Sequence, residues 1–180
     1  GIWMKDTAAS RRNKMSLRHA YGRSCNSFFA KVAVNHLGLG SITKFAERFG
    51  WGQDVPVDFQ VPESPFFHPA LASSSVHAVG RYAAGFGRVG TSAVHAAWRT
   101  LVIARDGKNV PLRLFVDSPL PREDQLKQVI QADTALQIRG MMDATVRGGT
   151  ASFAFRRGKH RRLRNLVGGK TGTLSGRAPK

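Results

Sequence analysis

Apolar residues of this 180-residue chain fall mainly into short stripes with the spacing of an α-helix, and glycines close several of the stripes. Side chains three or four positions apart share one helix face, so this period predicts helices. Gly38 and Gly50 are expected to end the second and third helices, and Ser41 to cap the start of the third. The helices are expected at about 16–21, 28–37, 42–49, 92–105, 126–130 and 133–146.

Three segments do not follow this period. Between Trp51 and Pro69 the chain holds four prolines, which indicates an irregular or edge-strand region. Leu166 and Val167 are expected to begin a short strand that continues through 168–173. Residues 1–16 are polar and basic, and are expected to form a loop or a frayed end.

The charge balance restricts the partners of the chain. It holds 28 Lys and Arg against 11 Asp and Glu, a formal net charge of +17, with 42% apolar residues for a packed core. Such an excess predicts attraction to nucleic acid, an anionic membrane surface or an anionic wall polymer, without choosing among them. Cys25 is the single cysteine, so no internal disulfide can form. Neither a membrane-spanning run nor a signal peptide is present, so any anchor is expected outside these residues.

The sequence Lys170-Thr171-Gly172-Thr173 is the strongest chemical signal. An ammonium on a strand can face an anionic substrate, and the glycine lets a ligand approach the backbone closely. A plain surface strand is the alternative interpretation. A phosphate-binding loop is excluded, because Arg164 stands where such a loop requires its first glycine.

Ser24-Cys25-Asn26 lies directly before a predicted helix. Ser and Asn are common N-cap residues, so capping is the simple interpretation of either residue. Ser-X-Asn at a helix start, followed ~140 residues later by Lys-Thr-Gly, is also the pair of second and third motifs of the penicillin-recognising serine enzymes. If both motifs belong to one site, Ser24 and Lys170 must lie within hydrogen-bonding or water-bridged reach.

Further segments resemble the transpeptidase domain of the class A penicillin-binding proteins, in the order of that family. The resemblance covers roughly residues 16–177. It implies an α+β, β-lactamase/transpeptidase-like fold with an antiparallel sheet packed against a helical region, so that 1–180 would be a partial transpeptidase domain, incomplete at both ends. The segments are 17–20, 28–29, 37–38, 49–52, 85–89, 104–107, 141–142, 146–151 and 167–175.

The resemblance also implies a function and a partner for the parent protein. The parent would be a serine-type DD-transpeptidase that cross-links peptidoglycan stem peptides through an acyl-enzyme, and β-lactams would bind the same site. No metal or organic cofactor and no specific nucleic acid is implied. The parent would be anchored in the cytoplasmic membrane, with this domain on the outer, periplasmic side.

The same resemblance assigns roles to single residues. Ser24 would relay a proton to the leaving amine, and Asn26 would hold the substrate amide and the catalytic lysine. Lys170 would set the electrostatics around Ser24 and favour the substrate carboxylate. The Thr173 backbone N–H would form half of the oxyanion hole. The residues implied to bind the substrate are Thr171, Gly172 and Thr173.

The sequence departs from the family pattern at the nucleophile. The first family motif, Ser-X-X-Lys, should lie well upstream of Ser-X-Asn, and none of the residues before Ser24 forms it. The one literal match, Ser41-Ile42-Thr43-Lys44, comes after Ser24 and is interpreted as a helix start. The chain is therefore expected to be a fragment that is inactive alone.

Other features have simpler interpretations. Gly85 to Gly90 fits a dinucleotide fingerprint but lacks the preceding strand, and the six histidines lack metal-site spacing. Residues 156–164 hold six cations without interleaved aromatic residues, which favours a solvated hairpin over a nucleic-acid grip. A non-catalytic basic module that binds nucleic acid or another polyanion stays the alternative function, and a degenerate homologue that binds wall polymer is also open.

Overall fold

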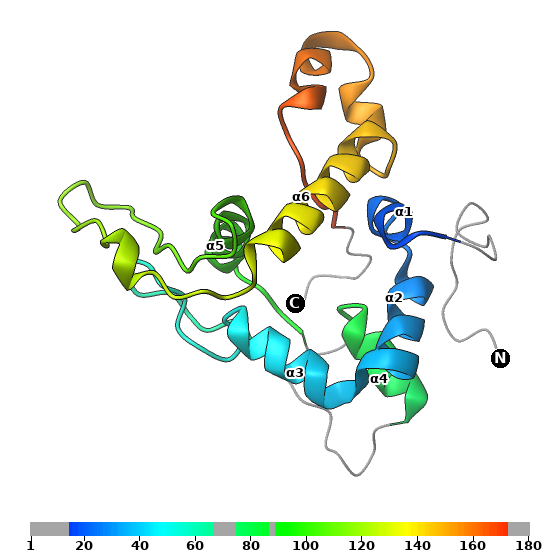
Figure 1. The fold of residues 1–180 in the computed structure, drawn as a ribbon, viewed down its shortest axis with the longest axis horizontal. Helices are drawn as coiled ribbons and strands as arrows, with labels where there is room; N and C mark the ends of the chain where they lie inside the picture. The colour runs from blue at the N-terminus through cyan, green and yellow to red at the C-terminus, as the bar shows by residue number, and fades with distance from the viewer. Residues whose placement is uncertain (1–14, 67–74, 87–88, 173–180) are drawn as a thin grey trace, which may run out of the picture. The chain divides into compact units, whose positions relative to one another are not determined.

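The computed structural model describes residues 15–66, 75–86 and 89–172, which form helices joined by irregular segments (Figure 1). The expected loop at 1–16 is therefore described only for its last two residues, and Thr173 lies outside the described residues. The α-helices are α1 Leu17–Gly22, α2 Asn26–Val32, α3 Gly38–Arg48, α4 Val76–Ala83, α5 Ala93–Ala104 and α6 Ala132–Arg147. The other helices are the π-helix η2 Ala33–Leu37 and the 3-10 helices η4 Glu123–Gln125, η5 Ser152–Phe155 and η6 Gly158–Asn165.

The chain divides into two compact units. The described part of the larger unit lies within Asn26–Ile138, and that of the smaller unit is 15–25 together with 139–172. The boundaries fall between Cys25 and Asn26 and inside α6. The residues implied to be catalytic are therefore divided between the units, with Ser24 and Lys170 in the smaller one.

The helices α1 and α5 begin where the sequence predicts, because local side chains satisfy their first N–H groups. Ser16 Oγ accepts a hydrogen bond from the backbone N–H of His19 at 3.2 Å, and Ser92 Oγ accepts one from His95 at 3.0 Å. Gly50 follows α3 with φ of 82°, a conformation that favours glycine. These ends are encoded by nearby residues alone.

The predicted cap at Ser41 is wrong. The helix α3 begins at Gly38, so Ser41 lies within its first turn and is not the residue before it. Gly38 has φ of 72° and donates its N–H to the carbonyl of Ala33, which closes η2 and lets α3 start at once. The chain thus turns at the glycine without the linker that a cap at Ser41 would need.

The predicted helix at 126–130 is also wrong. The backbone N–H of Val129 donates to the carbonyl of Gly107 at 2.8 Å, and Lys108 and Gln128 form an isolated antiparallel bridge. A β-carbon at Gly107 would lie 2.0 Å from the Ile130 carbonyl oxygen, so this approach requires glycine. Pairing with the turn after α5 has replaced the local helical bonds.

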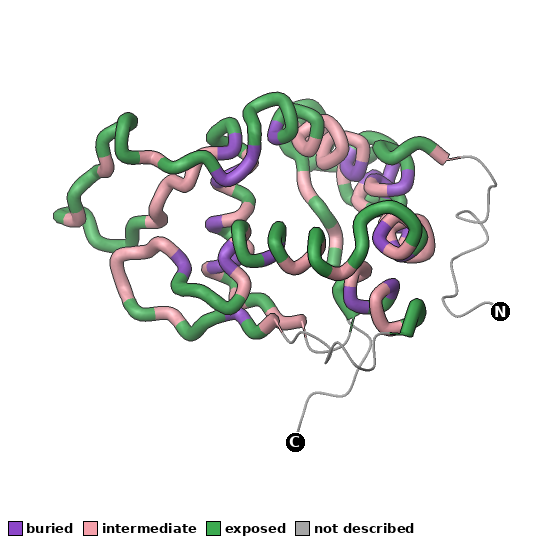
Figure 2. The backbone as a smooth tube through the Cα atoms, turned by 60° about the horizontal axis from the view of Figure 1, so that its bottom comes forward, coloured by how far each residue is buried: buried purple, intermediate pink, exposed green. Residues whose placement is uncertain are grey.

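The core of the larger unit forms where α5 meets the segments on either side of it in sequence. Its buried residues include Trp98 and Val102 from α5, Val55 from the proline-rich segment, and Val129 and Ile130 from the segment before α6. Trp98 also donates its indole N–H to Asn109 Oδ1 at 3.1 Å. Long exposed stretches of backbone separate the buried positions (Figure 2).

The described residues contain no β-strand. They hold three isolated bridges, of which two, Val57 with Leu112 and Phe66 with Val89, involve the irregular region that the prolines predict. Residues 167–172 are neither helix nor strand, so the predicted sheet has no counterpart in the part of the chain that is described. The hairpin expected at 156–164 is wrong, because η6 occupies most of this range. Among the described helices, none is long and apolar enough to cross a bilayer.

Candidate active site

Ser24 lies in the turn that ends α1, in a left-handed backbone conformation that glycine usually adopts. It has φ of 53°, and its N–H donates to the Tyr21 carbonyl at 3.0 Å while the Cys25 N–H donates to the Ala20 carbonyl at 2.9 Å. This pair of bonds is the Schellman cap, in which the residue at the position of Ser24 is usually glycine. Ala20 and Cys25 are buried, as the flanking apolar pair of such a cap usually is. The backbone of Ser24 therefore completes the end of α1, two residues before α2 begins at Asn26.

Lys170 and Ser24 are in direct contact. Lys170 Nζ donates a hydrogen bond to Ser24 Oγ at 2.7 Å across 146 positions of sequence. The ammonium also donates to the Thr171 carbonyl at 2.9 Å. The proximity of Ser24 and Lys170, expected from the order of the two motifs in the sequence, is confirmed.

Backbone hydrogen bonds hold the segment of Lys170 against α6, and the segment after α6 against the end of α1. The N–H of Gly169 donates to the Met142 carbonyl at 3.2 Å, and the N–H of Thr150 donates to the Gly22 carbonyl at 2.9 Å. A β-carbon at Gly149 would lie 2.0 Å from the Gly22 carbonyl oxygen. The close approach of these segments thus depends on the glycine after α6.

The electrostatics of the pair come from partial desolvation. Surrounding protein atoms reduce the hydration of the Lys170 ammonium, and this lowers the pKa of Lys170 from its ordinary value of 10.5. The ammonium also lies 5.9 Å from the centre of the Tyr21 ring, a cation–π distance. A less hydrated cation interacts more strongly with an anionic ligand.

The other predicted site residues occupy distinct positions. Asn26 is the first residue of α2, two residues along the chain from Ser24, and belongs to the larger unit. Thr171 Oγ1 shares a hydrogen bond with Thr150 Oγ1 at 2.5 Å. Gly172 is exposed, and within the described residues a β-carbon there would meet nothing within 4 Å.

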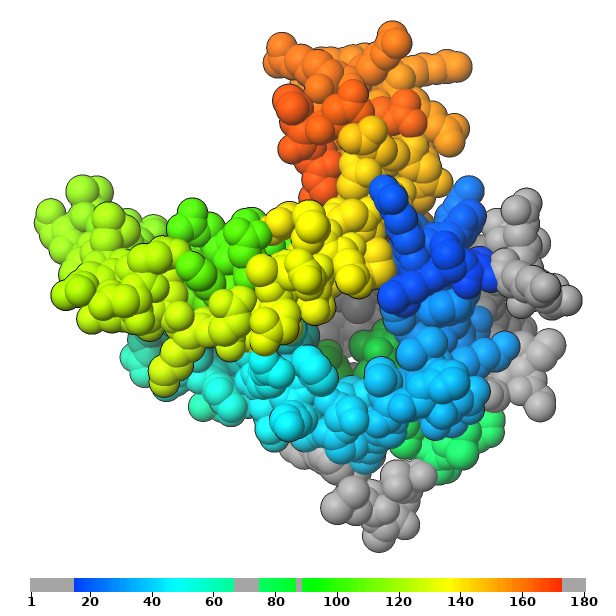
Figure 3. All heavy atoms as spheres, in the orientation of Figure 1, coloured from blue at the N-terminus to red at the C-terminus, as the bar shows by residue number. Residues whose placement is uncertain are grey.

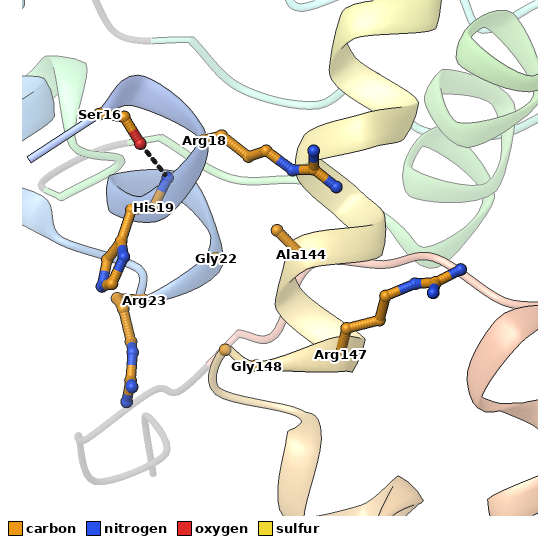
Figure 4. Close-up of a pocket in the computed structure, with 9 residues that line it drawn as sticks. Ser16, Arg18, His19, Gly22, Arg23, Ala144, Arg147 and Gly148 are labelled. Carbon is orange, nitrogen blue, oxygen red and sulfur yellow. Dashed lines mark hydrogen bonds between the residues drawn. The ribbon is translucent and has the colours of Figure 1, made fainter.

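A groove of about 440 Å³ lies between α1 and the end of α6 (Figure 4). Arg18 and Arg147 line it, and both pair with Asp143, at 3.3 Å and 2.5 Å. Figure 4 shows Arg18 reaching towards α6 and Arg23 pointing away from it. The Arg18 pair links α1 to α6, and the Arg147 pair lies within α6. Exposed pairs of this kind contribute little energy, about 0–1 kcal/mol each.

Sequence reasoning missed two residues beside the site, Tyr21 and Thr150. Tyr21 falls in the helix predicted at 16–21, and no sequence pattern indicates that its ring lies beside the Lys170 ammonium. Thr150 was noted only within the segment 146–151, although its hydroxyl contacts Thr171. Their place could be found only from the pairing of segments far apart in sequence. Within the described residues no group of three His, Cys, Asp or Glu could hold a metal ion.

Comparison with known proteins agrees with this geometry. Among curated proteins, penicillin-binding protein 3 of Bacillus subtilis (strain 168) is 26% identical over 145 residues, which are 76% of this chain and 21% of that protein. The chain thus spans about a fifth of the length of this relative.

Solved structures share the fold at lower identity. A protein of Atopobium parvulum described as a peptidoglycan glycosyltransferase matches with a TM-score of 0.63 and 24% identity, over 76% of this chain and 32% of that one. PBPA of Mycobacterium tuberculosis matches with a TM-score of 0.63 and 20% identity over the same shares. The same Mycobacterium protein has been solved as an imipenem acyl-enzyme complex, which covers 74% of this chain and 32% of that one, also with a TM-score of 0.63 and 20% identity.

The family assignment rests on most of the chain. Residues 1–177 match the family described as the penicillin binding protein transpeptidase domain. The two motifs of that family predicted from the sequence meet in one hydrogen bond. The chain therefore belongs to the penicillin-binding protein transpeptidase domain family.

Proposed function

We propose that the chain is part of a serine-type DD-transpeptidase domain, and that its parent cross-links peptidoglycan stem peptides through an acyl-enzyme. The observation that carries the proposal is the 2.7 Å hydrogen bond from Lys170 Nζ to Ser24 Oγ. A hydroxyl has one proton and two lone pairs, so Ser24 can accept from Lys170 and donate its own proton at the same time. A relay that protonates the leaving amine needs both abilities.

Lys170 and the residues after it would bind the substrate carboxylate. The partly desolvated ammonium provides the charge, and Thr171, next to it, provides a hydroxyl. Among the described residues none would crowd a β-carbon at Gly172, which supports close approach of a ligand to the backbone there. Thr173 would add a second hydroxyl and half of the oxyanion hole, and Asn26 would hold the substrate amide and the catalytic lysine.

The nucleophile of the proposed reaction would come from a Ser-X-X-Lys motif outside these 180 residues. Ser41 is not assigned this role, because its Ser-X-X-Lys sequence follows Ser24 in the chain and so reverses the order of the family motifs. Residues 168–173 would pair with further strands of an antiparallel sheet, and the whole chain would be one partial domain. The parent would be anchored in the cytoplasmic membrane and would react with β-lactams on its outer side.

Covalent labelling with a fluorescent penicillin tests the proposal. Acylation requires an attacking serine, an adjacent base and two oxyanion donors. The 180-residue chain should therefore take up no label on a denaturing gel or by intact mass. The parent protein, carrying Ser-X-X-Lys, should label.

Variants of the parent protein separate the site from the rest of the chain. Lys170→Ala should slow acylation by roughly 100-fold, the usual cost of one preorganised electrostatic group. Lys44→Ala, which removes an exposed lysine of α3, should leave the rate unchanged. A stable adduct on a serine of the 180-residue chain, or equal rates for the two variants, would refute the proposed roles.

A further inference from the structure

The segment after α6 concentrates positive charge without any compensating acid. From residue 144 to the end the sequence has ten Lys or Arg and no Asp or Glu. We call residues 152–165, which form η5, η6 and their connection, the basic arm. Its exposed cations, none of which has an ion pair within the described residues, are Arg156, Arg157, Lys159, Arg161 and Arg162.

The cations of the basic arm are held close together by its 3-10 helix. Residues three positions apart eclipse one another in such a helix, so Lys159 and Arg162 project on the same side of η6. A shallow depression of about 560 Å³ is lined by Gly158, Lys159, Arg161, Arg162 and Asn165. Long side chains of this segment (orange) project outward in Figure 3. Like charges at this spacing repel one another, and an anionic phosphate among them removes the repulsion.

An exposed aromatic side chain adjoins these charges. Phe153 is 89% exposed, and the N–H of Arg156 returns to the Phe153 carbonyl. Phe155, in contrast, packs edge-on against His160 within the arm, with ring centres 6.5 Å apart. Apolar side chains beside a cluster of Lys and Arg are the pattern of peptides that lie in the headgroup region of a bilayer.

The combination of groups discriminates among polyanions. A soluble wall polymer would engage the cations and gain nothing from Phe153. Single-stranded nucleic acid is usually gripped by several rings interleaved with the cations, and here one free ring stands at one end of them. An anionic bilayer uses both features, phosphates for the cations and the acyl boundary for the ring.

We propose that the basic arm docks on the surface of an anionic phospholipid bilayer. Its guanidinium and ammonium groups contact lipid phosphates, and Phe153 inserts at the boundary between headgroups and acyl chains. This inference does not depend on the proposed transpeptidation, because it involves none of the motif residues at 24–26 or 170–173. It adds a second point of membrane contact to whatever anchor the parent has.

Sedimentation with vesicles tests the docking. The 180-residue chain should pellet with vesicles of 70% phosphatidylcholine and 30% phosphatidylglycerol, and stay in solution with pure phosphatidylcholine. Each cation near an anionic surface is worth roughly fivefold in partitioning, so Arg161→Gln with Arg162→Gln should weaken binding roughly 25-fold. Phe153→Ser should have its largest effect at high salt. Salt screens the attraction between the cations and the lipid phosphates but not the insertion of the aromatic ring, so the binding that remains depends on the ring.

Matched variants keep the test independent of folding and of net charge. Lys31→Gln with Lys44→Gln removes the same charge from exposed helix positions of the larger unit. This variant should weaken binding less than roughly threefold, because it lowers only the net charge of the chain and leaves the basic arm intact. Arg161→Lys with Arg162→Lys should bind as the unchanged chain does. Equal loss for the two double Gln variants would overturn the proposal. So would equal binding to both vesicle types, or tighter binding to heparin or DNA than to vesicles with no effect of Phe153→Ser.

Discussion

The two units of the chain are stabilised in different ways. In the larger unit the buried residues include a tryptophan and several branched aliphatic side chains, gathered around α5. In the smaller unit the buried residues are mostly small, among them Ala20, Gly22, Cys25, Gly149 and Ser152. Its segments meet instead through backbone hydrogen bonds such as that from Thr150 to Gly22.

This difference explains how the smaller unit can carry the candidate site. Where backbones approach closely, short side chains occupy the interior, and longer polar ones such as Lys170 remain available for a ligand. The larger unit should therefore be sensitive to lost volume, and the smaller unit to added volume. Four measurements would break or sharpen this comparison.

Trp98→Ala should have the largest effect. Trp98 is 2% exposed and donates its indole N–H to Asn109, so its removal leaves a cavity and an unpaired amide. The free energy of unfolding should fall by about 3–5 kcal/mol in urea denaturation. Phe153→Ala, at an exposed aromatic position, should change it by less than about 0.5 kcal/mol. Similar values for both variants would contradict a packed core at α5.

Gly149→Ala should have the second-largest effect, and it should destabilise the smaller unit by adding volume where two backbones approach closely. Its β-carbon would lie 2.0 Å from the Gly22 carbonyl oxygen, so the segments must separate. We expect a loss of about 1–3 kcal/mol, together with faster hydrogen exchange of the Thr150 amide. Gly140→Ala is the matched control, because a β-carbon in that part of α6 meets none of the described residues within 4 Å and should raise helix stability by up to about 1 kcal/mol. An unchanged Thr150 amide in Gly149→Ala would refute the close approach.

Stability of the larger unit should depend on pH through His95. Burial lowers the pKa of His95 from its ordinary value of 6.5, the hydrogen bond to the Phe49 carbonyl opposes this, and the charge of Arg99 lowers it further. The unfolded chain therefore binds the proton more readily than the folded one. The free energy of unfolding should fall as pH drops below 6.5, by up to about 1.4 kcal/mol per pH unit.

His95→Gln serves as the control for this dependence. Glutamine keeps a donor for the Phe49 carbonyl and cannot be protonated, so its unfolding curves should change less between pH 7 and pH 5. An identical pH dependence in the two proteins would assign the effect to other groups.

Ser24→Gly should have the smallest effect on stability, a gain when it is compared with Ser24→Ala. Ser24 has φ of 53°, which costs a side chain energy that glycine does not pay. We expect the free energy of unfolding of Ser24→Gly to exceed that of Ser24→Ala by about 0.5–1 kcal/mol. Both variants lack the hydroxyl, and only alanine keeps the strain of a β-carbon at this φ. In the parent protein both variants should slow acylation. Lower stability for Ser24→Gly than for Ser24→Ala would show that this turn does not require the left-handed conformation.

Sequence reasoning succeeded where a few neighbouring residues decide the structure. The hydroxyls of Ser16 and Ser92 each accept a hydrogen bond from the backbone N–H three residues further along, which caps α1 and α5. Gly50 ends α3 because glycine readily adopts a positive φ. It failed at 126–130, where the spacing of Leu126, Val129 and Ile130 fits a helix but the backbone pairs with Gly107 and Lys108. A period in the sequence shows which side chains can share a face, and it carries no information on distant backbone partners.

The sequence by itself determined the family, the order of its two motifs, most helix positions and the unbalanced charge after residue 143, because each is written in residue types and short spacings. The tertiary structure decided the conformation of Ser24 at the end of α1, the contact of Thr150 with Thr171, and the placement of Tyr21 under the Lys170 ammonium. The turn at Ser24 is held by local hydrogen bonds to the carbonyls of Tyr21 and Ala20, and the other two features depend on backbone contacts between segments far apart in the chain. Such contacts form only when Gly22 and Gly149 allow α1 and the end of α6 to meet.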